Sequence, residues 1–125
     1  MNLFTRNTRQ TGELAEHHAC LFLEKQGYQL VEKNFHCRYG EIDLVMKNDS
    51  HLVFIEVRYR KNIQFGTGAD TVNYNKQSKL VKSARFYLQQ HSKLENYAAR
   101  FDVISMTGDS DKYEIDWIEN AFEAY

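Results

Sequence analysis

Two segments of the chain place apolar residues three and four positions apart, which is the spacing of an amphipathic helix. The first helix is predicted over residues 11–26, with Thr11 as its N-cap and Gly27 just after its end. Its apolar face consists of Ala15, Ala19, Phe22 and Leu23. The second is predicted over residues 74–90, with an apolar face of Leu80, Val81, Ala84, Tyr87 and Leu88. Each helix is therefore expected to pack one face against the rest of the fold.

Five shorter segments have the composition of strands. They cover residues 28–35, 40–45, 53–60, 99–106 and 112–119. The first and the last of them are polar enough for the edges of a sheet. The order helix, three strands, helix, two strands (αβββαββ) predicts an α/β sandwich with a mixed central sheet. The second helix would be the crossover between the third and fourth strands.

Acidic residues interrupt two of these apolar strands, at Asp43 and at Glu56. Buried acids are rare in strands unless they are paired or bound to a ligand. If the connecting loop has an even number of residues centred on Asp49-Ser50, Asp43 lies directly opposite Glu56, where a divalent cation would relieve their repulsion. An odd loop pairs Asp43 with Ile55 instead, which puts the two acids on opposite faces of the sheet.

Two further acids are candidates for the same site. Glu16 lies at the border of the apolar face of the first helix, where a solvated acid is the simpler reading and a contact with the edge of the sheet is the alternative. Asp102 lies within the fourth predicted strand, and its pairing with Arg100 is favoured over a role beside Asp43.

The second helix carries four cations without acidic partners four residues away, namely Lys76, Lys79, Lys82 and Arg85. This pattern favours phosphate contacts slightly over an ordinary solvated face. Gln77 falls within the apolar face of the same helix. A buried amide needs partners, so Gln77 is either a satisfied core residue or part of a polar site.

Length and composition limit the class of protein. The chain has 125 residues, enough for one domain, which is expected over residues 11–120 between a mobile leader (1–10) and a short tail (121–125). The apolar runs are too short to span a membrane. Cys20 and Cys37 match no disulfide or zinc spacing, which favours a cytoplasmic protein. The formal net charge of −1 means that a surface for nucleic acid must be local.

With these elements in place, the chain resembles the restriction-endonuclease-like PD-(D/E)xK superfamily. It resembles more closely the small YraN-type predicted endonuclease family, which is related to archaeal Holliday junction resolvases. The resemblance extends from Gly12 to about Met106. The matching residues are Glu16 with Ala19, Gly27-Tyr28, residues 40–44 (GEIDL), residues 54–60 (FIEVRYR), Phe65-Gly66, Lys76 and residues 100–103 (RFDV).

The resemblance implies a restriction-endonuclease-like fold and a metal-dependent nuclease site. Asp43 and Glu56 match the two acids that bind Mg²⁺ or Mn²⁺, and Glu16 matches the acid of the first helix. Gln77 matches loosely a polar residue that related nucleases carry on a helix. Arg58 stands at the position of the catalytic lysine of the superfamily. An arginine stays protonated, so it can hold a phosphate but cannot deprotonate a water molecule.

Two functions follow as expectations. The first is hydrolysis of phosphodiester bonds in DNA, with branched or damaged DNA as the candidate substrate and with Arg60, Lys76 and Lys79 on neighbouring phosphates. The second is a non-catalytic relative that binds nucleic acid or a partner protein. Junction-cutting members of the superfamily act as symmetric dimers, so a homodimer through an edge strand is a further expectation.

Overall fold

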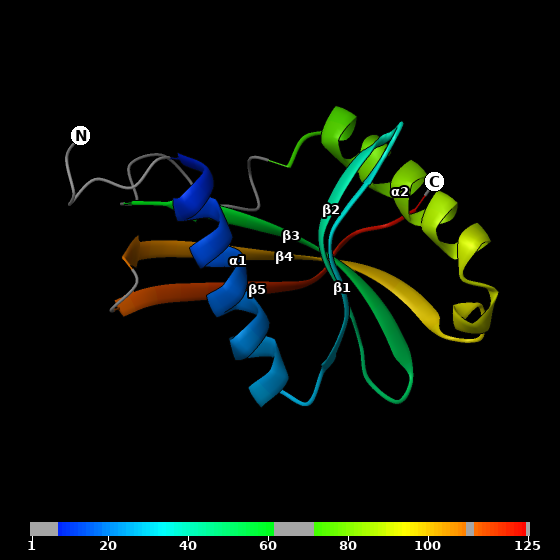
Figure 1. Cartoon of the computed structure of the whole chain (residues 1–125), viewed down its shortest axis with the longest axis horizontal. Helices are drawn as coiled ribbons and strands as arrows, with labels where there is room; N and C mark the ends of the chain where they lie inside the picture. Colours follow the sequence, from blue (N-terminus) through cyan, green and yellow to red (C-terminus); the bar gives the residue numbers. More distant parts are fainter. Residues whose placement is uncertain (1–7, 62–71, 110–111, 125) are drawn as a thin grey trace.

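The structure, a computed structural model, describes residues 8–61, 72–109 and 112–124, and these form one five-stranded sheet flanked by two α-helices (Figure 1). The elements follow in the order α1 (Thr8–Lys25), β1 (Gln29–Cys37), β2 (Gly40–Lys47), β3 (His51–Arg60), α2 (Tyr74–Gln90), the short 3-10 helix η2 (Ser92–Leu94), β4 (Ala98–Asp109) and β5 (Lys112–Phe122). Apart from η2, this is the predicted order, and the fold class α/β is confirmed.

The strands lie side by side in their sequence order, with β1 and β5 at the edges of the sheet, as predicted. Three neighbouring pairs are antiparallel, and β3 and β4 are parallel. A parallel pair needs a crossover connection, and α2 lies in the connection between these two strands. The sheet is therefore mixed, and β3 lies at its centre between the hairpin partner β2 and the parallel partner β4.

The hairpin of β2 and β3 has the even register. Leu44 pairs with Ile55 and Lys47 with Leu52. The hairpin closes through the backbone nitrogen of Asn48, which donates to the carbonyl oxygen of His51 at 3.0 Å, and the loop between them is Asp49-Ser50. One residue beyond the pair of Leu44 and Ile55, this register sets Asp43 opposite Glu56. The even-loop alternative is confirmed, and the odd one is excluded.

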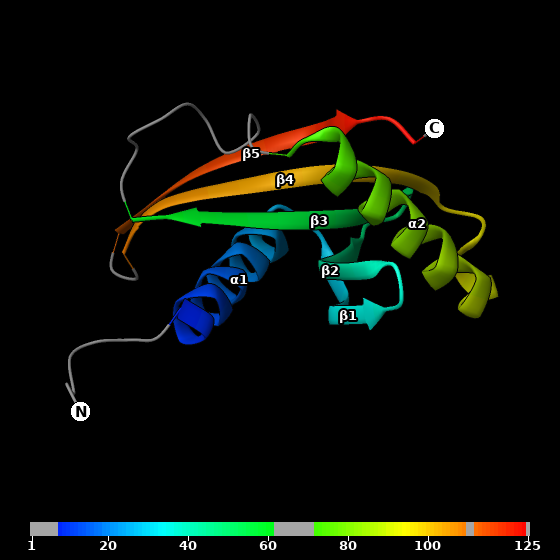
Figure 2. The same ribbon diagram turned by 90° about the horizontal axis from the view of Figure 1, so that it is seen from above.

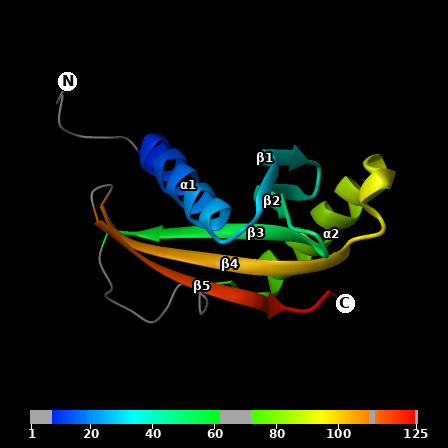
Figure 3. The same ribbon diagram turned by 90° about the horizontal axis from the view of Figure 1, so that it is seen from below.

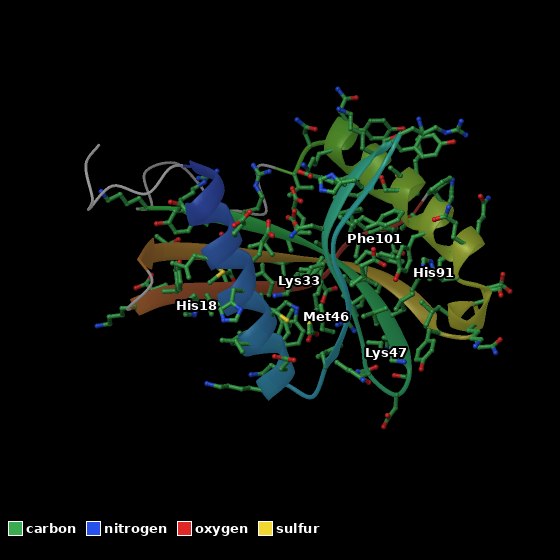
Figure 4. The ribbon with its side chains drawn as sticks, viewed as in Figure 1. His18, Lys33, Met46, Lys47, His91 and Phe101 are labelled. Atoms are coloured by element: carbon green, nitrogen blue, oxygen red, sulfur yellow. The ribbon has the colours of Figure 1, made fainter. Side chains whose placement is uncertain are left out.

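The helices pack against opposite faces of the sheet. Ala15, Ala19 and Leu23 of α1 share one core cluster with Met46, Val53, Ile55 and Ile104. Leu80, Val81, Ala84 and Tyr87 of α2 share the other with Val45, Phe54, Phe101 and Val103. Figures 2 and 3 show α1 against the long strands and α2 towards the end that carries β1 and β2. Figure 4 labels Met46 and Phe101, one from each cluster.

Several boundaries differ from the prediction. α1 begins at Thr8 and not after an N-cap at Thr11. β5 continues to Phe122, three residues past the predicted end, because Phe122 pairs with Phe101 and their rings stack with centroids 5.0 Å apart. Residues 1–7 of the expected leader and the Phe65-Gly66 segment lie outside the described residues.

Two smaller expectations concern membranes and cysteines. No helix in the described part of the chain has the length and the apolar character needed to cross a membrane. Cys20 and Cys37 are free thiols, the first buried and the second half-buried.

Candidate functional site

The site is centred on two acids that the β2–β3 hairpin holds together. Asp43 is 9% exposed and Glu56 is 4% exposed. Oδ2 of Asp43 accepts a hydrogen bond from the backbone nitrogen of Val57 at 2.8 Å, and its carboxyl group also shares a hydrogen bond with Glu56. Burial, followed by the nearby charge of Glu56, raises the pKa of Asp43 to about 8. The pair of Asp43 and Glu56 therefore retains a proton to a higher pH than an isolated aspartate would.

The donor set of this pair suits a hard divalent cation. If both carboxyl groups were ionised, their charges would repel one another. A proton shared by the pair removes this repulsion, and a bound cation would do the same. Mg²⁺ prefers carboxylate oxygens and binds through one or two carboxylates together with water and substrate phosphate. Within residues 8–61, 72–109 and 112–124, no group of three Asp, Glu, His or Cys side chains is arranged as a set of metal ligands. Any cation here would thus rely on Asp43 and Glu56 alone among the acids.

Two cations converge on one oxygen of Glu56. Nζ of Lys76 lies 3.2 Å from Oε2 of Glu56, and a guanidinium nitrogen of Arg58 lies 3.5 Å from the same atom. Lys76 belongs to the first turn of α2, whose N-cap Asn73 accepts a hydrogen bond from the backbone nitrogen of Lys76. Glu56 is thus contacted by Lys76 from the crossover helix α2 and by Arg58, which lies two residues further along β3.

Glu16 is close enough to the acid pair to affect its charge. This agrees with the predicted contact at the edge of the sheet rather than with a fully solvated acid. It is half-buried, and burial raises the pKa of Glu16 against the opposing hydrogen bond with the side chain of Asn34. The charges of Glu41, Glu13 and Glu56 raise the pKa of Glu16 further, in that order, and the charge of Glu16 in turn raises the pKa of Asp43. α1 and the hairpin therefore place three acids in one electrostatic neighbourhood.

Sequence reasoning did not find Asn34, the hydrogen-bond partner of Glu16. Asn34 lies within β1 with a φ of 51°, a left-handed conformation that asparagine adopts more readily than most residues. The only signal in the sequence was an asparagine inside a strand, where this residue type is depleted.

Asp102 has a structural role in the β4–β5 region, and its predicted pairing with Arg100 is confirmed. Nε of Arg100 donates to Oδ1 of Asp102 at 2.9 Å, and a second guanidinium nitrogen donates to Oδ2 at 3.0 Å. Nε1 of Trp117 and the backbone nitrogen of Asn120 donate to the same carboxylate, each at 2.9 Å. These four bonds commit both oxygens of Asp102.

The remaining predicted residues lie in α2 and at the end of β3. Nε2 of Gln77 donates to the carbonyl oxygen of Val72 at 2.9 Å, which links the residue to the backbone before α2. Lys79 is exposed and lines a pocket of about 370 Å³ together with Lys76 and residues of the β1–β2 turn. Arg60 is half-exposed at the end of β3. Contacts of these residues with nucleic acid stay predictions.

Comparison with known proteins adds relatives that cover nearly the whole chain. "UPF0102 protein" of Legionella pneumophila (strain Corby) is 44% identical over 117 residues, which are 94% of this chain and 98% of the relative. The protein of the same name from Coxiella burnetii (strain RSA 493 / Nine Mile phase I) is 46% identical over 116 residues, covering 93% and 94% of the two chains. That of Pseudomonas syringae pv. tomato is 41% identical, covering 98% and 100%.

A family model gives the same result. The model described as "Uncharacterised protein family UPF0102" matches residues 15–106. The match includes Glu16, Asp43, Glu56, Arg58 and Lys76, all of the residues that meet at the acid pair. This chain belongs to the UPF0102 family, which is the YraN-type group that its sequence resembles.

Proposed function

We propose that this protein is a cytoplasmic, metal-dependent nuclease that hydrolyses phosphodiester bonds in DNA, with branched or damaged DNA as its substrate. The observation that carries the proposal is the acid pair, in which Asp43 and Glu56 are buried, opposed and joined by a hydrogen bond. Burial of two opposed carboxyl groups destabilises a folded domain, and such arrangements are found mainly at functional sites.

Asp43 and Glu56 would hold the cation, for which Mg²⁺ or Mn²⁺ fits the oxygen donors. A divalent cation here supplies charge that activates water and stabilises the phosphate during hydrolysis. The backbone nitrogen of Val57 keeps Asp43 in place through its 2.8 Å hydrogen bond. Glu16 adds negative charge at the border of the site and strengthens its attraction for a cation.

The cations around Glu56 divide the remaining work. Arg58 lies at the border of the site and holds the scissile phosphate through its fork of donors. The ammonium group of Lys76 lies 3.2 Å from Glu56, whereas β3 itself supplies only the guanidinium group of Arg58. Once a cation occupies the acids, this ammonium is available to hydrogen-bond the phosphate or the attacking water. Lys79 and Arg60 contact neighbouring phosphates, which gives affinity that depends on salt and not on sequence.

A cleavage assay tests this function. Labelled duplex, single-stranded and four-way-junction DNA are incubated with the protein in Mg²⁺, in Mn²⁺ and in a chelator. Cleavage is expected with the metals only, and the isosteric variants Asp43→Asn and Glu56→Gln should each lose at least about 100-fold in rate. Asp49→Asn is the matched control, because Asp49 lies in the loop of the same hairpin and is exposed.

A second candidate function is favoured by one observation. Lys76 and Arg58 already surround Oε2 of Glu56, so the acid has cationic partners without a metal. In that case the chain is a non-catalytic member that binds nucleic acid or a partner protein. Binding of junction DNA without cleavage, unchanged by Asp43→Asn and by chelator, would establish this second function and contradict the nuclease.

A further inference from the structure

A pocket on the α2 side of the molecule is not explained by the acid pair. It has a volume of about 310 Å³ and lies where the turn between β1 and β2 meets the outer surface of α2. Figure 1 shows this turn beside α2. We name it the Tyr39 pocket, and its lining residues are Arg38, Tyr39, Lys82, Arg85, Phe86 and Gln89.

The floor of the Tyr39 pocket is aromatic and held in position. The rings of Tyr39 and Phe86 meet edge to face with centroids 6.1 Å apart, and Phe35 supports Phe86 at 6.3 Å. Both Tyr39 and Phe86 remain partly exposed. The guanidinium carbon of Arg38 lies 4.9 Å from the centroid of Tyr39, and a nitrogen of Arg38 donates to its hydroxyl oxygen at 2.7 Å. The pocket thus offers two aromatic rings inclined at 67° to one another, with the guanidinium group of Arg38 stacked over the ring of Tyr39.

The border of the pocket is positively charged. Arg38, Lys82 and Arg85 are all exposed there, and no acidic side chain of the described residues is part of the lining. An aromatic floor with a cationic border complements a ligand that has both a ring to stack and a negative charge. A nucleotide has these two properties, since its base stacks and its phosphate is charged.

The pocket lies further along α2 than the proposed nuclease site. Lys76, which reaches Glu56, also lines the neighbouring pocket of about 370 Å³ with Lys79. From Lys76 to Arg85 α2 advances by roughly 14 Å at 1.5 Å per residue. That length corresponds to about four nucleotides of a stacked strand. A strand cut beside Glu56 that follows α2 and passes the β1–β2 turn would therefore reach the Tyr39 pocket a few nucleotides away.

We infer that the Tyr39 pocket binds an unpaired base of single-stranded nucleic acid, while Arg38, Lys82 and Arg85 contact the adjoining phosphates. The bases of an intact duplex are stacked and paired, so they cannot enter the pocket without being extruded. The inference rests on the proposed function and narrows its substrate class. The substrate is a nucleic acid with a single-stranded segment next to the bond that is cut, as in a flap or an open branch.

Fluorescence anisotropy in the presence of a chelator tests the pocket without any cleavage. The probes are a short oligothymidine, a blunt duplex of the same length and an oligomer of abasic sites that has the phosphates but no bases. The wild-type protein should bind oligothymidine about tenfold more tightly than the abasic oligomer. Oligouridine is run in parallel, so that a preference for DNA or for RNA is measured directly.

Matched variants assign the effect to the pocket. Tyr39→Ala should weaken oligothymidine binding about tenfold, leave duplex binding within about twofold and abolish the discrimination against the abasic oligomer. Tyr39→Phe retains the ring and should bind as the wild type does. Lys82→Ala should weaken both probes and lower the single-strand salt slope by about 0.7. Lys112→Ala removes an exposed cation at the start of β5 and should change nothing.

The inference is overturned if the wild-type protein binds the abasic oligomer as tightly as oligothymidine, a result that requires no variant to fold. It is equally overturned if folded Tyr39→Ala keeps full affinity for oligothymidine. Cleavage by the wild-type protein together with either result would leave the nuclease intact and remove only the pocket. Base-dependent binding without cleavage in Mg²⁺ or Mn²⁺ would support the pocket and contradict the nuclease.

Discussion

Nζ of Lys76 in α2 lies 3.2 Å from Oε2 of Glu56 in β3. Glu56 is 4% exposed, and this ammonium group is nearer to its Oε2 than the guanidinium group of Arg58, which lies at 3.5 Å. The resemblance to the superfamily places a lysine two residues after this glutamate, where this chain has Arg58. Lys76, which belongs to the crossover helix α2, therefore places a lysine beside Glu56, although β3 itself has arginine at position 58.

Removal of this lysine should separate catalysis from binding. We expect Lys76→Ala to lower the cleavage rate about 100-fold, because an ammonium group beside Glu56 then no longer reaches the reacting phosphate. Lys79→Ala, one turn along α2 and exposed, should lose only a few-fold through weaker phosphate binding. The double variant Arg58→Lys with Lys76→Ala should recover cleavage, as measured in single-turnover assays. Full activity in Lys76→Ala would show that its contact with Glu56 is only structural.

The buried acid pair should make stability depend on pH. The pKa of Asp43 is raised to about 8 in the folded protein, against an ordinary value of 3.8. Between these values the folded state holds a proton that the unfolded state has lost, so the metal-free protein should lose stability as the pH rises from about 4 to about 8. Asp43→Asn should flatten this trend and stabilise the protein at pH 8.

Urea unfolding at a series of pH values, in the presence of a chelator, measures this effect. The exposed residue Asp49 again serves as a control, because Asp49→Asn should leave the slope unchanged. A wild-type stability that is constant or rises over this range would contradict the raised pKa of Asp43.

Binding of Mg²⁺ should release a proton from the same carboxyl group. Metal ligands must be deprotonated, so below about pH 8 the cation competes with the proton of Asp43. The apparent affinity should then rise about tenfold for each pH unit up to this value. Calorimetry in buffers of different ionisation enthalpy should count close to one proton released at pH 7 and fewer at pH 9. In Asp43→Asn both the heat of binding and the released proton should disappear.

The Asp102 cluster should affect stability and not metal binding. Its carboxylate receives hydrogen bonds from Arg100, Trp117 and the backbone of Asn120. Replacement by alanine leaves a guanidinium with no partner carboxylate, so Asp102→Ala should lower the free energy of unfolding by about 3–5 kcal/mol. Unfolding followed by Trp117 fluorescence measures the loss. Asp116→Ala, an exposed acid on β5, should change it by less than about 0.5 kcal/mol.

The order of elements and the faces of both helices were predictable because they depend on local periodicity. The apolar spacing at Ala15, Ala19 and Leu23 identified the buried face of α1 correctly. The termini were not predictable to the residue. β5 extends to Phe122 because its ring stacks on Phe101, a contact between residues 21 positions apart. Nothing near Phe122 in the sequence signals that contact.

The sequence identified the two acids of the candidate site, and it predicted that they meet only if the loop between their strands has an even number of residues. Asp43 and Glu56 stand out because apolar strands seldom contain carboxylates, and this is visible in any reading of the sequence. Whether the two acids meet depended on the parity of the loop at Asp49-Ser50, for which both alternatives were compatible with the pattern. The hydrogen bond that closes the hairpin at Asn48 and His51 excludes the odd alternative.

The chain's local pattern was enough to give the elements, their order and the candidate acids, because periodicity and residue type act over a few positions. The position of Lys76 beside Glu56, of Glu16 beside both acids, and of Tyr39 over Phe86 depended on how α1, α2 and the β1–β2 turn pack on the sheet. These contacts join residues that are 20 to 47 positions apart. Their side chains meet only when burial of both helix faces brings the elements together.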